Sequence, residues 1–182
     1  MDFTPKSIVL KNGRTLTLRA PRTEDAQTLV DYLEKTAGES PYLLREPGEK
    51  KMSVEAEAEF IGRILASPSE CMLIAEVNGV FAGNCQVSFM TRRKTAHRAS
   101  LAIALYRAFW NMGVGTAMME AMLGLAQAHG TRQAELAYIG GNERGKALYE
   151  KMGFAECGRI PNAYRFSDGS FHDEIFMVKT LK

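Results

Sequence analysis

The feature that most constrains this chain is a strand, a glycine-containing turn and a helix that follow one another near its middle. Residues 99–105 are mostly small and apolar, which is typical of a strand covered on both faces. Gly113-Val114-Gly115-Thr116 then leads into a segment whose apolar residues recur with the period of a helix: Met119, Met122, Leu123 and Ala126. Glycines expose N–H groups and a helix start adds partial positive charge, so this turn favours a phosphate or pyrophosphate.

Two nucleotide-binding motifs do not fit this turn. A P-loop needs a lysine after the second glycine, and Gly115 is followed by Thr116. A dinucleotide fingerprint needs a third glycine three residues after Gly115, where Met118 stands. A turn with two glycines can also be purely structural, so by itself it is weak evidence for a ligand.

The rest of the sequence predicts alternating strands and helices in a mixed α+β fold. Besides 99–105, strands are expected at 8–10, 15–19, 71–77, 80–90, 133–139, 154–160, 164–166 and 171–178. Asn78-Gly79 gives the clearest hairpin signal, because this pair tolerates two positive φ angles.

Four helices are predicted from apolar spacing and from capping residues. Thr23 and Ser53 are expected to cap the first two, with residues 38–51 as a loop between them. The third runs from Thr116 to about 128, and the fourth covers 143–152 and ends at Gly153. The second helix is expected to bury Phe60, Ile61, Ile64 and Leu65 and to expose Glu55, Glu57 and Glu59.

Composition narrows the function classes. The 182 residues suit one domain, 1–182, and 46% hydrophobic residues argue against disorder. With 23 basic and 21 acidic residues the net charge is +2, which gives no overall field for nucleic acid or anionic lipid. Three scattered cysteines without a CxxC pair indicate neither a disulfide framework nor a metal site. With neither a secretory signal nor a membrane-length apolar run, we expect a cytoplasmic protein without a membrane partner.

Two segments resemble the GNAT superfamily of N-acetyltransferases. The family's cofactor motif runs from a strand into Arg/Gln-x-x-Gly-x-Gly/Ala and then a helix. Residues 113–116 match it, with Trp110 in place of the usual Arg or Gln. Residues 142–154 resemble the family pattern Asn-x-x-Ala-x-x-x-Tyr-x-x-x-Gly-Phe, with Gly145 in place of alanine and Tyr149 at the tyrosine. The two motifs occur in the family's order, and the resemblance covers nearly the whole chain.

The resemblance implies a mixed, mostly antiparallel sheet with one splayed parallel strand pair, flanked by helices. The pair here is 101–105 and 133–138. It also implies transfer of an acetyl group from acetyl-CoA to a primary amine of a small molecule or a protein N-terminus, by direct attack in a ternary complex. Dimers are common in this family, so a homodimer is compatible with the resemblance.

The same resemblance assigns roles to individual residues. The cofactor is expected to contact Ile103, Ala104, Leu105, Trp110, Asn111, Met112, Gly113, Val114, Gly115, Thr116, Asn142 and Ala147. Tyr149 is the candidate general acid that protonates the departing sulfur, although it could instead be an aromatic packed under the sheet. Asn142 could contact the cofactor, cap the helix, or do both.

The sequence does not name a general base. The inward positions of the strand before the glycine turn are Ala99, Leu101 and Ile103, none of which can accept a proton. Other candidates are each better explained as surface residues: His97, Glu76, Glu135, and the group Glu55, Glu57 and Glu59. We therefore expect deprotonation through ordered water or by a remote carboxylate.

Two other functions compete with an enzyme. A catalytically silent acyl-CoA-binding sensor would fit the missing base on the strand, whereas the retained Tyr149 favours catalysis. A nucleic-acid-binding protein built around Arg92-Arg93-Lys94 and Arg98 is the weaker alternative, and we expect no nucleic-acid partner.

Overall fold

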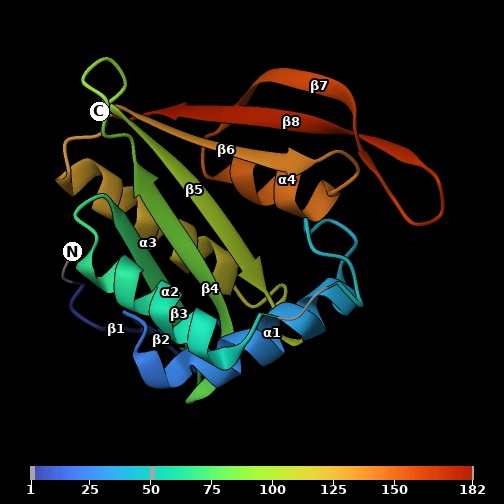
Figure 1. Ribbon diagram of the computed structural model, residues 1–182. Helices are drawn as coiled ribbons and strands as arrows, with labels where there is room; N and C mark the ends of the chain where they lie inside the picture. The colour runs from blue at the N-terminus through green and yellow to red at the C-terminus, as the bar shows by residue number, and fades with distance from the viewer. Residues whose placement is uncertain (1–2, 50–51, 182) are drawn as a thin grey trace.

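The computed structural model describes residues 3–49 and 52–181, and these form an eight-stranded sheet in the order β1-β2-β3-β4-β5-β6-β8-β7 (Figure 1). Its strands are β1 Lys6–Val9, β2 Thr15–Arg19, β3 Glu70–Val77, β4 Val80–Phe89, β5 Arg98–Leu105, β6 Gln133–Ile139, β7 Ala155–Arg165 and β8 Phe171–Thr180. Neighbouring strands run antiparallel except β5 and β6, which are parallel. The predicted mixed, mostly antiparallel α+β fold is therefore confirmed.

Helices cover the sheet on both faces. They are α1 Ala26–Glu39, α2 Val54–Ala66, α3 Val114–Ala128 and α4 Glu143–Lys151, with short 3-10 turns at Thr23–Asp25 and Arg107–Phe109. Helices α1 and α2 pack together over β3, where Leu29, Tyr32 and Ile61 are almost fully buried. Helix α3 packs against β3, β4 and β5 and buries its apolar stripe in the main core, which also contains Tyr149 of α4.

The parallel pair β5–β6 is joined over only three residue pairs. Arg98 lies opposite Gln133, Ala99 opposite Ala134, and Ser100 opposite Glu135. Beyond these pairs β5 continues beside β4 and β6 continues beside β8, so the two strands diverge (Figure 1). The splayed pair that the resemblance implied is present, with its parted section at 101–105 and 136–139.

Several turn and cap predictions are confirmed. Asn78 and Gly79 both have positive φ, at 49° and 76°, as their hairpin requires. The Ser53 hydroxyl caps α2 by accepting a hydrogen bond from the Ala56 N–H at 3.2 Å. Gly153 has φ 84° directly after α4, which is the left-handed conformation common at a helix end.

Other local predictions are wrong at the helix ends. Thr23 does not cap α1; it begins a 3-10 turn whose Asp25 pairs with Arg19 at 2.7 Å. Helix α1 continues through Gly38 to Glu39, so the loop starts later than expected, and Lys50 and Lys51 lie outside the described residues. Helix α3 begins at Val114 rather than at Thr116.

The predicted burial also needs correction. Glu57 is 3% exposed rather than solvated, and burial raises the pKa of its carboxyl group while the nearby Arg45 opposes the rise. Leu65, expected to be buried, is exposed. The expected strands 154–160 and 164–166 form one strand, β7, because the irregularity between Ile160 and Tyr164 shifts the register without ending the pairing.

Gly83 tests the close approach of β4 to β5. A Cβ added at Gly83 would lie 2.3 Å from the backbone oxygen of Ala104, which cannot move without breaking the ladder. We expect Gly83→Ala to lower the free energy of unfolding by about 1–3 kcal/mol. Gly124→Ala, at an open position of α3, should instead raise it by about 0.5–1 kcal/mol. Urea denaturation measures both changes. A Gly83→Ala variant as stable as the wild type would contradict the close approach of β4 to β5 at this position.

Candidate active site

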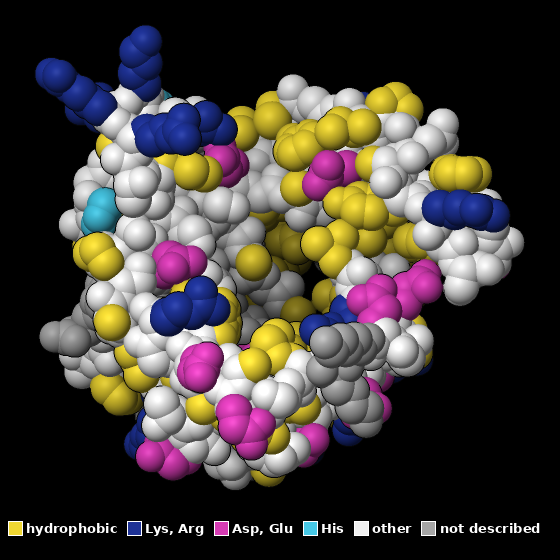
Figure 2. Space-filling model, in the orientation of Figure 1, with side chains coloured by type: hydrophobic (Ala, Val, Ile, Leu, Met, Phe, Trp, Pro, Cys, Tyr) yellow, Lys and Arg dark blue, Asp and Glu magenta, His cyan; other side chains and the backbone are white. Residues whose placement is uncertain are grey.

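A cleft of about 1090 Å³ opens where β5 and β6 part. It is bordered by the end of α1 and the loop after it, by β5, by the glycine turn, by β6 and by α4. Figure 2 shows the molecule hollowed here, with hydrophobic side chains in its depth. The second half of β5 is therefore not covered on both faces as predicted: Ala102 is exposed and residues 103–105 are half-buried.

The glycine turn exposes backbone at one end of the cleft. Asn111 has φ 62° and Gly113 has φ 86°, a region that favours glycine, and Gly113 is the N-cap of α3. The first N–H groups of any α-helix have no acceptor within the helix, so those of α3 are available at this point. Together with the positive end of the helix dipole, they form a site suited to an anion.

Two cations from α4 reach the same turn. The Arg144 guanidinium lies 4.5 Å from the centre of the Trp110 ring and donates to Asn111 Oδ1 at 2.5 Å. The Lys151 ammonium donates to Thr116 Oγ1 at 3.2 Å. The sequence analysis missed both residues, although their spacing of seven places them on one face of a helix.

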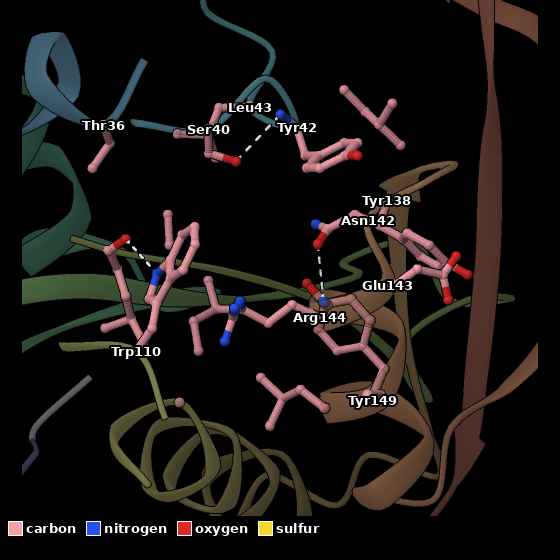
Figure 3. A pocket seen from close by; sticks show the side chains of 18 of the residues that line it. Thr36, Ser40, Tyr42, Leu43, Trp110, Tyr138, Asn142, Glu143, Arg144 and Tyr149 are labelled. Atoms are coloured by element: carbon pink, nitrogen blue, oxygen red, sulfur yellow. Dashed lines mark hydrogen bonds between the residues drawn. The ribbon is translucent and has the colours of Figure 1, made fainter. Parts of the chain in front are cut away.

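Trp110 is held in place by its surroundings. Its indole N–H donates to the Leu105 carbonyl at 3.2 Å (Figure 3). The Arg107 guanidinium lies 5.5 Å from its ring centre. Where the family usually has Arg or Gln, this chain therefore places an aromatic ring that Arg107 and Arg144 approach. Positive charge near position 110 comes from these two neighbours.

Tyr149 projects from α4 into the cleft (Figure 3). The residue is 9% exposed, and its ring centre lies 5.8 Å from that of Tyr138. Burial, with a smaller contribution from Tyr138, raises the pKa of Tyr149 to about 12. The hydroxyl is therefore protonated at neutral pH and can donate a proton or a hydrogen bond.

Asn142 caps α4 and also lines the cleft. Its Oδ1 accepts a hydrogen bond from the Gly145 N–H at 2.9 Å. A Cβ at Gly145 would lie 2.8 Å from Asn142 Nδ2, so an alanine there would displace the cap amide.

The other end of the cleft carries a tyrosine and a carboxylate from β7 and β8. The Tyr164 hydroxyl donates to Glu174 Oε1 at 2.8 Å. Burial, followed by this hydrogen bond, raises the pKa of Tyr164 to about 12. Tyr42, in the loop after α1, points toward the cleft and packs against Phe166 of the β7–β8 hairpin at 6.2 Å between ring centres (Figure 3). The sequence analysis missed Tyr164 and Glu174.

Most residues expected to contact the cofactor border this cleft, but Met112 and Val114 do not. Those on it are Ile103, Ala104, Leu105, Trp110, Asn111, Gly113, Gly115, Thr116, Asn142 and Ala147. The Val114 side chain is fully buried in the main core, and the Met112 side chain packs against that core. Both side chains therefore contribute to packing. Contact of all twelve with a cofactor, through side chain or backbone, stays a prediction.

None of the earlier candidates for a general base lines the cleft. Glu76 pairs with Arg19 at 2.6 Å, and Glu135 pairs with Arg98 at 2.5 Å. His97 is exposed at the start of β5, and the three glutamates lie on α2. Arg98, one of the four basic residues of the suggested nucleic-acid patch, is neutralised by Glu135.

Comparison with known proteins identifies the family. The model of the acetyltransferase (GNAT) family matches residues 35–154, a span that includes the glycine turn, Tyr149 and most of the cleft. The chain belongs to the GNAT acetyltransferase family. The prediction of an acetyl-CoA-dependent N-acetyltransferase is thereby confirmed. No curated protein matches the sequence at a significant level.

Solved structures share the fold of this GNAT protein. An acetyltransferase of the GNAT family from Streptococcus pneumoniae has a TM-score of 0.84 and 26% identity, covering 91% of this chain and 99% of that one. A phosphinothricin acetyltransferase from Sinorhizobium meliloti, in complex with acetyl-CoA, has a TM-score of 0.78 and 20% identity, covering 91% of this chain and 88% of that one. RimL, a ribosomal L7/L12 α-N-protein acetyltransferase in complex with coenzyme A, has a TM-score of 0.77 and 16% identity, covering 91% of this chain and 94% of that one.

Two further observations concern the described part of this GNAT protein. None of its described helices has both the length and the apolar character that crossing a bilayer requires. Within residues 3–49 and 52–181, no three His, Cys, Asp or Glu side chains gather as metal ligands.

Gly113 tests the anion site. Valine at φ 86° is strained, and its side chain would stand at the exposed turn, so we expect Gly113→Val to weaken coenzyme A binding at least about tenfold. Gly130→Val, at φ 82° beyond the far end of α3, imposes similar backbone strain away from the cleft and should leave affinity unchanged. Isothermal titration calorimetry measures both, and equal affinities would place the phosphates elsewhere.

Proposed function

We propose that this GNAT protein transfers the acetyl group of acetyl-CoA to a primary amine of a small molecule or a protein N-terminus, by direct attack while both substrates are bound. The observation that carries the proposal is one continuous cleft that joins the glycine turn, Tyr149 and the Tyr164–Glu174 end. Such a cleft has room for a donor and an acceptor at the same time, as direct transfer requires.

The donor's pyrophosphate is proposed to bind the N–H groups of the glycine turn, with Arg144 and Lys151 adding positive charge. Its pantetheine arm would enter between the parted strands. The β5 edge at 101–105 and the β6 edge at 136–139 are not paired with each other, so their backbone groups can bond an extended amide-containing chain. Small residues such as Ala102, Ala104 and Ala137 leave space beside that backbone.

The chemistry needs a neutral amine and a proton for the departing sulfur. An alkyl amine with a pKa of about 10 is neutral in roughly one molecule in 10³ at pH 7. Its nitrogen attacks the thioester carbonyl, the C–N bond forms and the C–S bond breaks. Tyr149 is proposed to protonate the sulfur, because it borders the cleft and its hydroxyl is protonated at neutral pH.

The acceptor is proposed at the level of its reacting group. Structural neighbours include a phosphinothricin acetyltransferase and a ribosomal-protein N-terminal acetyltransferase, so the fold serves both small and peptide amines. We further propose that the chain works as a single cytoplasmic domain, in line with its three free cysteines.

A panel of amines tests the proposal. Polyamines, amino acids, aminoglycosides and short peptides are each incubated with acetyl-CoA, and free coenzyme A is followed with a thiol reagent and the product by mass spectrometry. We expect acetylation of at least one class. Tight binding of acetyl-CoA without turnover on any amine would instead indicate the acyl-CoA sensor.

Tyr149→Phe tests the general acid. Removing the hydroxyl should lower kcat by about 10²-fold or more, because the sulfur loses its proton donor. The affinity for acetyl-CoA should change less than twofold, since Tyr149 is proposed to act on the transition state. Tyr138→Phe, the neighbouring ring in the same cleft, is the control and should have a much smaller effect on kcat. An unchanged kcat in Tyr149→Phe would remove Tyr149 from the chemistry.

The pH profile gives an independent check on Tyr149. Because burial raises the pKa of Tyr149 to about 12, the acid form persists through the whole neutral and mildly alkaline range. We therefore expect no loss of kcat attributable to this residue below about pH 10. A fall in kcat centred near pH 8 that disappears in Tyr149→Phe would contradict this protonation state.

A further inference from the structure

One carboxylate stands in the cleft at the end away from the glycine turn. Glu174 lies on β8 opposite Ile139 of β6 and Ile160 of β7, so it sits in the middle of the three-stranded part of the sheet beyond the gap. The next residue, Ile175, points to the other face and is buried in the main core. The alternation of the strand therefore directs Glu174 to the face that borders the cleft, where it is half-buried.

Tyr164 fixes one oxygen of this carboxylate and leaves the other available. Its hydroxyl donates to Oε1 at 2.8 Å, and its raised pKa of about 12 keeps it a donor over the physiological range. Among residues 3–49 and 52–181, Oε2 has no hydrogen-bond or ion-pair partner. A half-buried carboxylate held in this way is suited to an incoming ammonium group.

The described cations that border the cleft gather at one end, where Glu39 also lies. Arg144 and Lys151 contact the glycine turn, and Arg107 donates its backbone N–H to Glu39 at 2.6 Å and approaches Trp110. The three described cations that border the cleft thus lie toward the proposed phosphate site. An anionic donor would be drawn to these cations, and Glu174 offers a cationic acceptor a carboxylate away from them.

We propose that Glu174 binds the ammonium group of the acceptor and takes its proton, directly or through one water, and that Tyr164 is its positioning residue. The proposal rests on the proposed function and names its missing base, the remote carboxylate that the sequence could not locate. It specifies the acceptor as a primary amine that is protonated at neutral pH.

The proton balance of the reaction is complete with these two residues. The acceptor R–NH₃⁺ gives one proton to Glu174, which later releases it to solvent, and the free lone pair forms the C–N bond. The C–S bond breaks and its electron pair stays on sulfur, which takes a proton from Tyr149. The nitrogen then returns a second proton to Tyr149 and keeps the third in the product amide.

The groups around Glu174 leave this role open to it. His172, two residues away on the same face of β8, is occupied by the Gly140 carbonyl at 2.9 Å and the Ser170 hydroxyl at 3.1 Å. Asp173 faces the other way and pairs with Arg159 at 3.3 Å. On α4, Glu143 is exposed in the first turn. Tyr138 on β6 lies opposite Ile175 in the ladder and is buried on the other face of the sheet.

Glu174→Gln tests the proposal, because it keeps the shape and the acceptor for Tyr164 but removes the base. With an alkyl amine that the wild-type protein acetylates, we expect kcat/KM for the amine to fall by about 10²–10³-fold at pH 7. The KM for acetyl-CoA and the unfolding midpoint should stay unchanged. Glu156→Gln removes an exposed carboxylate of β7, which pairs with Arg159, and should retain wild-type kinetics.

Two readouts separate proton transfer from a structural role. The Glu174→Gln activity should recover about tenfold per pH unit between pH 7 and 9, as the amine deprotonates in solution. With an amine whose pKa is below about 6, which is already neutral at pH 7, the kcat/KM of Glu174→Gln should fall less than tenfold. Tyr164→Phe should lower kcat/KM for the amine about tenfold. The double variant should be no slower than Glu174→Gln alone, because Tyr164 acts through Glu174.

The outcomes are distinguishable from failure of the proposed function. If the wild-type protein acetylates no amine, the proposed function itself fails. If the wild type is active and Glu174→Gln matches it, or loses equally on weakly and strongly basic amines, Glu174 is not the base. An additive loss in the double variant would show that Tyr164 acts independently of Glu174.

Discussion

The site depends on the parting of two parallel strands. β5 and β6 are joined over three residue pairs, and each then continues beside a different antiparallel partner. Buried backbone N–H and C=O groups need hydrogen-bond partners, so the edges that face the gap must bond water or an extended ligand. A sheet that stayed paired to the end of β5 would be a better core and would have no cleft. The missing hydrogen bonds between β5 and β6 leave a place where a peptide-like chain can bind.

The positions of the charged side chains in the cleft also depend on the parting of β5 and β6. Helix α3 follows the parted β5 by way of the glycine turn, which borders the cleft. Helix α4 brings Arg144 and Lys151 to that turn. The strands beyond the gap bring Glu174 to the other end. Tyr149 lies in the cleft with both, where removal of water raises the pKa of its hydroxyl and keeps it protonated. Donor binding, proton donation and amine binding can therefore be assigned to different walls of one cavity.

Local signals predicted the elements well, and the errors have physical causes. The residues 99–105 look like a strand covered on both faces, but the composition of a core strand and that of a strand beside a ligand cleft are the same. Glu57 follows the pattern of an exposed helix face, yet the folded chain buries it near Arg45. The irregularity in β7 reads as a break between strands, although the neighbouring strand β8 keeps the pairing across it. Each error concerns what a distant segment does.

The sequence by itself determined what depends on backbone torsions over a few residues: the glycine turn, the helix with its capping Asn142, and the place of Tyr149 on that helix. The tertiary structure alone decided which side chains meet across the cleft. Arg144 reaches Asn111 and Trp110 only because α4 docks beside the start of α3. Tyr164 meets Glu174 only because the irregularity in β7 shifts its register against β8. Register and docking are set by the packing of the whole core, and no short stretch of sequence contains that information.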